Sequence, residues 1–231
     1  MTRRSSFVEP APVIRHRRTR HGMGTWVLIS AWLVITVAGL AYLANYEHTP
    51  GISRQAPRVW PGASQLERSQ QRHTLLLFAH PHCPCTRASF NELACLMADC
   101  QNQVDVHVVF VKPPRADETI EWSSGALWNI ADEIPGVQTY LDEGGIEARR
   151  FASLTSGQVL LFDAKGQLQF QGGITSSRGH SGDNEGRHAV VERILGQKSE
   201  FATTLVYGCE LGTGDSNGRS TICREGTSCL P

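Results

Sequence analysis

The sequence predicts an α/β protein, in which a mixed sheet is flanked by helices and preceded by one transmembrane helix. Three observations carry this prediction. An uncharged apolar stretch of about 20 residues follows a basic N-terminal segment. Short apolar runs, typical of buried strands, then alternate with segments of helical periodicity. The resulting order is strand, helix, strand, helix, strand, helix, two strands and a final helix, as in sheets covered by helices.

The segment 24–46 carries no charged residue and is long enough to cross the hydrocarbon core as a helix. Trp26 and Tyr42 near its ends suit the headgroup region, and the arginines before it favour a cytoplasmic N-terminus. We therefore expect a basic cytoplasmic tail (1–23), a single-pass helix in a bacterial-type inner membrane, and a periplasmic or otherwise extracytoplasmic remainder. The alternative is a cleaved signal peptide, processed near Gly39-Leu40-Ala41.

The overall composition gives no support to nucleic-acid binding or to a disordered chain. Lys plus Arg total 22, as do Asp plus Glu, so no surplus of charge favours a nucleic-acid partner or disorder. No Ser-His-Asp order, phosphate loop or basic aromatic stripe stands out. The seven cysteines are many for an exported domain, where thiols usually pair, and an odd number leaves at least one unpaired within a monomer.

Proline-containing, aperiodic sequence in 47–72 predicts a tether. A domain is expected over 73–197, followed by a cysteine-containing tail, 198–231. Within the domain, apolar runs predict strands at 74–79, 104–111, 137–140, 159–163 and 168–170, the last two as a hairpin. Helical spacing predicts helices after residue 85, within 120–134, at 145–151 and at about 184–195.

The first strand leads directly into Cys83-Pro84-Cys85, and a helix follows at once. Unpaired N–H groups at a helix N-terminus favour a thiolate over a thiol, so this pair is expected to be reactive. Pro84 restricts the connecting backbone, which would make a disulfide within the motif strained and oxidising. We assign Cys83 as the attacking thiol and Cys85 as the resolving thiol; a structural disulfide is the alternative.

The segment 78–85, with its following helix, resembles the redox-active turn of thioredoxin-fold proteins, and 157–162 resembles the strand after their cis-proline loop. The resemblance covers about 74–196 and is closest to the membrane-anchored thioredoxin-like proteins labelled RedB, whose signature resembles 178–184. It implies a thiol-disulfide oxidoreductase acting on protein or small-molecule thiols and disulfides, without a cofactor. The chain departs from the pattern in the single residue between its cysteines and in Gly157, which stands where the cis-proline would be.

Two further functions remain open. A copper or zinc site could use five side chains with nitrogen and sulfur donors: His80, His82, Cys83, Cys85 and His180. That arrangement is similar to Sco-type copper delivery, although Sco proteins have three residues between their cysteines. Glycine at 157 has no ring to exclude an ion, so Gly157→Pro is expected to weaken metal binding without harming disulfide exchange. The non-catalytic alternative is a redox-inert scaffold.

The remaining histidine and cysteines carry structural expectations. His180 is either a proton shuttle or ligand, or a loop residue bonded to backbone. Cys95 lies near leucines in its helix and is expected to be buried, so Cys83 should be the more accessible thiol, with the lower pKa and the faster alkylation. The tail is expected to form a disulfide staple with one cysteine left over and to have no catalytic role. The pairing stays open for the other five cysteines: Cys95, Cys100, Cys209, Cys223 and Cys229.

Overall fold

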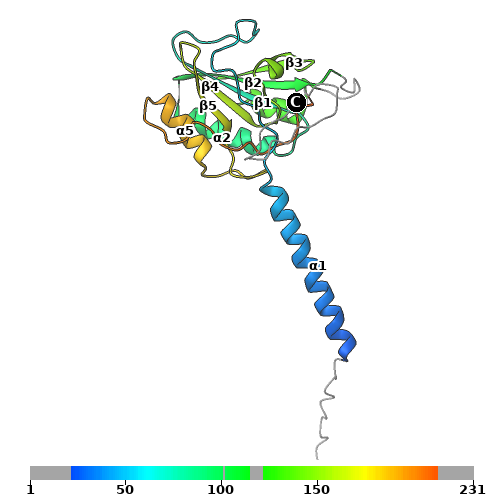
Figure 1. Cartoon of the computed structure of the whole chain (residues 1–231). Helices are drawn as coiled ribbons and strands as arrows, with labels where there is room; N and C mark the ends of the chain where they lie inside the picture. Colours follow the sequence, from blue (N-terminus) through cyan, green and yellow to red (C-terminus); the bar gives the residue numbers. More distant parts are fainter. Residues whose placement is uncertain (1–21, 101, 115–121, 213–231) are drawn as a thin grey trace, which may run out of the picture. The chain divides into compact units, whose positions relative to one another are not determined.

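The computed structural model describes residues 22–100, 102–114 and 122–212 (Figure 1). The chain divides into two compact units, with the boundary between Leu43 and Ala44. Helix α1, Met23–Glu47, is 25 residues long and buries none of them. Its length and composition are sufficient to cross a membrane, which is compatible with an anchored protein. The basic tail that predicts its orientation lies almost wholly outside the described residues.

The second unit is built on a mixed sheet with the strand order β3-β2-β1-β4-β5. The first three strands are parallel to one another, whereas β4 and β5 are antiparallel additions. The strands are β1 (His73–Ala79), β2 (Val104–Lys112), β3 (Val137–Glu143), β4 (Gln158–Phe162) and β5 (Leu168–Gly173). The helices of this unit are α2 (Thr86–Asp99), α3 (Ala126–Asp132), α4 (Ile146–Arg150) and α5 (Glu185–Ile194). The sequence therefore predicted the thioredoxin-like element order correctly.

Alternation along the central strand β1 divides the core between the two faces of the sheet. Leu75 and Leu77 face a cluster formed by α2, α3 and α5, and α2 and α5 lie side by side there (Figure 1). Leu76 and Phe78 face the opposite side. Because β1 is buried on both faces, its near-continuous apolar run is what the fold requires.

Coil segments cover much of the face of the sheet to which Leu76 and Phe78 point. The segment expected to be a free tether contributes the buried side chains of Ala56 and Leu66, and the segment after α5 contributes Leu211. The two segments also contact each other, since the Gly51 N–H donates to the Val206 carbonyl at 2.8 Å. Both therefore belong to the packed unit over the described residues, which corrects the expectation of an extended tether and a separate tail.

Candidate active site

The Cys83-Pro84-Cys85 motif lies in a turn between the carboxyl end of β1 and the first residue of α2. The Cys83 N–H donates to the His80 carbonyl at 3.0 Å, and the Cys83 carbonyl accepts from the Thr86 N–H at 3.1 Å. Cys85 is the N-cap residue of α2 and makes no side-chain capping bond. The motif is thus placed where open α/β sheets carry their sites, at the carboxyl ends of parallel strands.

A third cysteine joins this turn. The Cys209 sulfur lies 2.8 Å from the Cys83 sulfur, although 126 positions separate the two residues in the chain. A disulfide requires about 2.05 Å between its sulfurs, so the described state has the two thiols in contact and unbonded. Cys209 therefore lies at the cysteine turn as a free thiol, and not in the tail disulfide that the sequence predicted. Cys223 and Cys229 lie outside the described residues.

Backbone pairing holds Cys209 over the loop that precedes β4. The Cys209 carbonyl accepts from the Ser156 N–H at 2.8 Å, and the Leu211 N–H donates to the Leu154 carbonyl at 2.8 Å. The approach is very close beside Gly208, where an added Cβ would lie 1.9 Å from the Ser156 carbonyl oxygen. Glycine is therefore required at 208, because any side chain would push the segment away from the loop.

The side chain of Ser156, in the same loop, also contacts the turn that carries Cys83 and Cys85. The Ser156 hydroxyl accepts from the His80 N–H and contacts the Thr86 hydroxyl, each at 2.8 Å. Ser156 thus joins three parts of the site through its backbone and side chain: the end of β1, the start of α2 and the Cys209 segment. Nothing in the sequence pattern marked this serine in advance.

The three thiols differ in acidity. Burial alone would raise the pKa of the Cys83 thiol, but hydrogen bonds from the Cys209 thiol, the Thr86 hydroxyl and backbone N–H groups outweigh it and lower that pKa. Burial and the neighbouring Cys83 sulfur raise the pKa of Cys85, and they raise that of Cys209 to about 12. Cys83 is therefore the thiol most readily ionised among the three, and the cause is its hydrogen bonds, first of all with Cys209.

Arg178 brings a positive charge to the site. Its guanidinium Nη1 donates to the Gly208 carbonyl at 2.6 Å and its Nε to the Thr49 carbonyl at 3.1 Å. Its positive charge also opposes the upward pKa shifts of Cys85 and Cys209. A single side chain after β5 therefore fastens the Cys209 segment and stabilises the thiolates. The sequence places Arg178 within the signature-like segment 178–184 but gives no sign of this role.

The histidines proposed as metal ligands make other contacts in the described state. His80 and His82 flank Trp122, with ring centroids 5.5 and 5.8 Å from the indole, and burial followed by the His82 charge lowers the pKa of His80. His180 is exposed and its ring contacts the Arg178 carbonyl at 3.1 Å. Over the described residues, no group of three His, Cys, Asp or Glu side chains is arranged to hold a metal ion.

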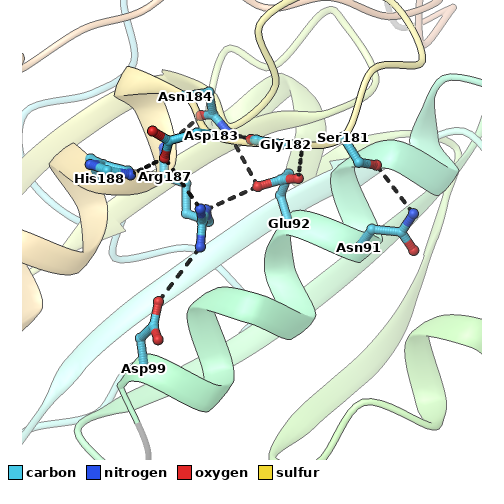
Figure 2. Close-up of polar contacts among 9 residues, drawn as sticks. All are labelled: Asn91, Glu92, Asp99, Ser181, Gly182, Asp183, Asn184, Arg187 and His188. Carbon is cyan, nitrogen blue, oxygen red and sulfur yellow. Dashed lines mark hydrogen bonds and ion pairs between the residues drawn. The ribbon is translucent and has the colours of Figure 1, made fainter.

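The loop between β5 and α5 is fixed by a buried carboxylate on α2 (Figure 2). Glu92 is only 3% exposed. It accepts from the Gly182 N–H at 2.6 Å and from Asn184 Nδ2 at 3.2 Å, and pairs with Arg187 Nε at 2.9 Å. Asn184 in turn caps α5 by accepting from the Arg187 N–H. The signature-like loop is thus anchored as a structural unit beside the site.

Glu92→Gln is expected to lower the free energy of unfolding by about 2 kcal/mol, because the amide keeps the volume but loses the charge that receives three donors. Chemical denaturation of the full chain in detergent, followed by tryptophan fluorescence, measures this change. Glu133→Gln is the matched control, since Glu133 is exposed. Equal shifts for the two variants would show that the Glu92 contacts contribute nothing specific.

Two expectations about thiol exposure are wrong. Cys95 is exposed, because it lies on the outer side of α2 while Leu93 and Leu96 face the core. Cys83 is only 1% exposed, beneath the Cys209 segment. Cys95 is therefore the accessible thiol of the two, and preferential alkylation of Cys83 does not follow. Cys100 is buried at the C-cap of α2, and burial followed by the Asp99 charge raises its pKa to about 11.

Gly157 cannot be replaced by proline as the sequence suggested. It has φ of +90°, and its N–H donates to the Phe78 carbonyl at 2.8 Å. Proline is restricted to a φ near −65° and has no N–H, so Gly157→Pro would break this junction of β4 with β1. The expectation that the variant leaves disulfide exchange intact is therefore wrong.

No protein-family model matches the chain, and no curated protein matches it. Solved structures do. A hypothetical protein from Sinorhizobium meliloti superposes with a TM-score of 0.54 at 15% identity, covering 69% of this chain and 96% of that one. A thioredoxin-like protein in its oxidized form gives a TM-score of 0.41 at 17% identity, over 66% and 97% of the two chains. ScoI from Arabidopsis thaliana, with copper bound, gives 0.39 at 16% identity, over 55% and 85%. These likenesses concern the fold.

Proposed function

We propose that this protein is a membrane-anchored thiol-disulfide oxidoreductase in which Cys83 attacks disulfides of proteins or small molecules. The observation that carries the proposal is a buried thiol of lowered pKa, placed between β1 and α2, with a second thiol 2.8 Å away. A thiolate is the nucleophile in disulfide exchange, and a neighbouring thiol completes the two-electron step. The RedB-type assignment rests on the signature loop and stays part of this proposal.

The chemistry needs no cofactor. The Cys83 thiolate attacks one sulfur of a substrate disulfide, which forms a mixed disulfide and releases the other substrate sulfur as a thiolate. A second protein thiolate then attacks the Cys83 sulfur, forming a protein disulfide and releasing the remaining substrate thiolate. The substrate gains two electrons and the protein loses two. The helix α1 would hold this domain at the outer surface of a bacterial-type inner membrane, with the N-terminus in the cytoplasm.

Equilibration of the full chain in detergent with glutathione redox buffers tests the function directly. A defined midpoint, with reversible loss of two thiols per protein, is the expected result. Native mass spectrometry of the reduced chain with and without copper gives a separate readout for metal delivery. Tight stoichiometric copper binding without reversible thiol chemistry would replace the oxidoreductase proposal by the metal one, and neither behaviour would leave the inert scaffold.

The rate of exchange is expected to rise with pH through a midpoint below the ordinary cysteine value of about 8.5. The sign follows from the lowered pKa of Cys83: the reactive thiolate forms as pH rises, and it forms earlier than at an unperturbed thiol. An ordinary thiol is only a few per cent ionised at pH 7. Stopped-flow rates with oxidised glutathione between pH 5 and 9 or so measure the profile. A midpoint at or above the ordinary value would contradict the lowered pKa.

A further inference from the structure

We infer that Cys209, rather than Cys85, is the resolving thiol of Cys83, so that the working disulfide joins the cysteine turn to the segment after α5. The inference rests on the proposed function and specifies its second step. The two sulfurs are 2.8 Å apart, and both segments are bonded to Ser156, the Cys209 segment through the Ser156 N–H and the cysteine turn through the Ser156 hydroxyl. Closing this contact to about 2.05 Å requires a small movement of one side chain.

Cys85 is less suited to that step. It is one residue from Cys83 across Pro84, so a bond between them would close a small ring whose backbone has little freedom to adjust. Burial and the Cys83 sulfur raise the pKa of both thiols, that of Cys209 to about 12, and the Arg178 charge opposes the rise at both. The Cys83 charge is removed when Cys83 is in a mixed disulfide, so the acidity of Cys209 does not exclude it from the second step. Cys209 is free of the ring restriction, because it comes from a segment 126 positions away in the chain and its sulfur is already 2.8 Å from that of Cys83.

The same segment controls access to Cys83. Cys83 is 1% exposed, whereas Cys85 and Cys209 are half-buried. Because the Cys209 sulfur is in contact with that of Cys83, we expect a substrate disulfide to reach Cys83 only when Gly208 and Cys209 move aside. These two residues are held by the bond from the Ser156 N–H to the Cys209 carbonyl and by the bond from Arg178 to the Gly208 carbonyl, whereas Leu211, buried in the core, keeps the end of the segment in place. A local movement of Gly208 and Cys209 would expose the attacking thiolate, and their return would deliver the resolving thiol.

The balanced sequence has two exchanges. The Cys83 thiolate forms a mixed disulfide with one substrate sulfur, and the other leaves as a thiolate. The Cys209 thiol then loses its proton to solvent or to the departing thiolate, attacks the Cys83 sulfur and displaces the remaining substrate thiolate. The product is a Cys83–Cys209 disulfide. Cys85 remains reduced throughout.

Peptide mapping of the oxidised full chain tests the inference without any substitution. Trypsin releases Cys83 and Cys85 together in the peptide 73–87, and Cys209 alone in the peptide 199–219. After equilibration with oxidised glutathione in detergent, acid quenching and digestion, we expect these two peptides to be joined by a disulfide. A peptide 73–87 oxidised within itself, with 199–219 reduced, would overturn the inference.

Serine variants then assign the resolving step. All are made in a background that lacks the exposed Cys95 and the two distal tail cysteines (Cys95→Ser, Cys223→Ser, Cys229→Ser). With oxidised glutathione, the background protein should release two glutathiones and retain none. Cys209→Ser should hold glutathione on Cys83 at least about 100-fold longer, because it loses an intramolecular attack. Cys85→Ser, the matched control, should behave as the background does.

The opposite pattern, rapid resolution in Cys209→Ser and persistence in Cys85→Ser, would overturn the inference and leave the proposed function standing. A background protein that does not react with oxidised glutathione at all would overturn both.

Gly208→Ala displaces the Cys209 segment while every thiol is retained, because the added Cβ would collide with the Ser156 carbonyl. It should slow resolution as Cys209→Ser does, whereas Gly62→Ala, which meets no atom within 4 Å, should not.

Discussion

Cys83→Ser is expected to reduce disulfide exchange to the rate of the uncatalysed reaction, a loss on the order of 100-fold or more. The serine hydroxyl remains protonated at neutral pH, so the site loses its nucleophile while the shape of the side chain is nearly kept. Turnover of oxidised glutathione by the full chain in detergent, with a thiol-regenerating reductant, measures this loss. A change in the unfolding midpoint would be small by comparison, because the substitution removes no backbone bond of the turn.

Cys95→Ser is the matched control for this experiment, since it makes the same chemical change at an exposed position on α2. It should retain the parent rate. If Cys83→Ser keeps its activity while Cys85→Ser loses it, the order of attack within the motif is reversed and Cys83 is not the nucleophile. If both keep their activity, the exchange occurs outside the cysteine turn.

Arg178→Ala is expected to loosen the Cys209 segment and to change both chemical steps in opposite directions. The variant loses the 2.6 Å bond to the Gly208 carbonyl and the 3.1 Å bond to the Thr49 carbonyl. Because the side chain is partly exposed, we expect a loss of about 1–3 kcal/mol in the free energy of unfolding. For each 1.4 kcal/mol lost from the free energy that holds the Cys209 segment against the site, the attack of Cys83 on an external disulfide should become about tenfold faster.

The second step should slow in the same variant, because the segment no longer presents Cys209 to the mixed disulfide. Rapid-quench mass spectrometry follows the appearance and decay of glutathione on the protein. Arg178→Lys is the control. Lysine keeps the positive charge near the thiols but lacks the planar guanidinium that donates to the Thr49 and Gly208 carbonyls together. A lysine variant that restores both rates would show that charge alone matters, and unchanged rates in Arg178→Ala would remove this residue from the site.

Local patterns in the sequence were sufficient to predict the elements and the cysteine turn. The apolar run of β1 and the helical periodicity of α2 and α5 were recognisable, because apolar residues are spaced differently in a buried strand and in a helix. The same spacing misplaced Cys95, which adjoins Leu96 in sequence but lies on the solvent side of the helix. One helical position corresponds to about 100°, so a residue beside a buried one can be fully exposed.

The contact between Cys83 and Cys209 could not be predicted in this way. It depends on aperiodic segments that cover the second face of the sheet and on a close approach that only Gly208 permits. Such segments show no periodic spacing of apolar residues. Their backbone hydrogen bonds reach loops far away in the sequence, as does the bond from the Ser156 N–H to the Cys209 carbonyl. The sequence predicted a redox turn, therefore, but not the thiol that meets it.

The most direct test of the account is to find where an external disulfide first attaches. The reduced full chain carrying Cys95→Ser is mixed with oxidised glutathione in detergent, quenched in acid before resolution, digested with trypsin and analysed by fragment mass spectrometry. Glutathione is expected to appear first on Cys83 in the peptide 73–87 and to leave as that peptide becomes linked to 199–219. Glutathione that appears first on Cys85 or Cys209, with Cys83 unmodified throughout, would contradict it.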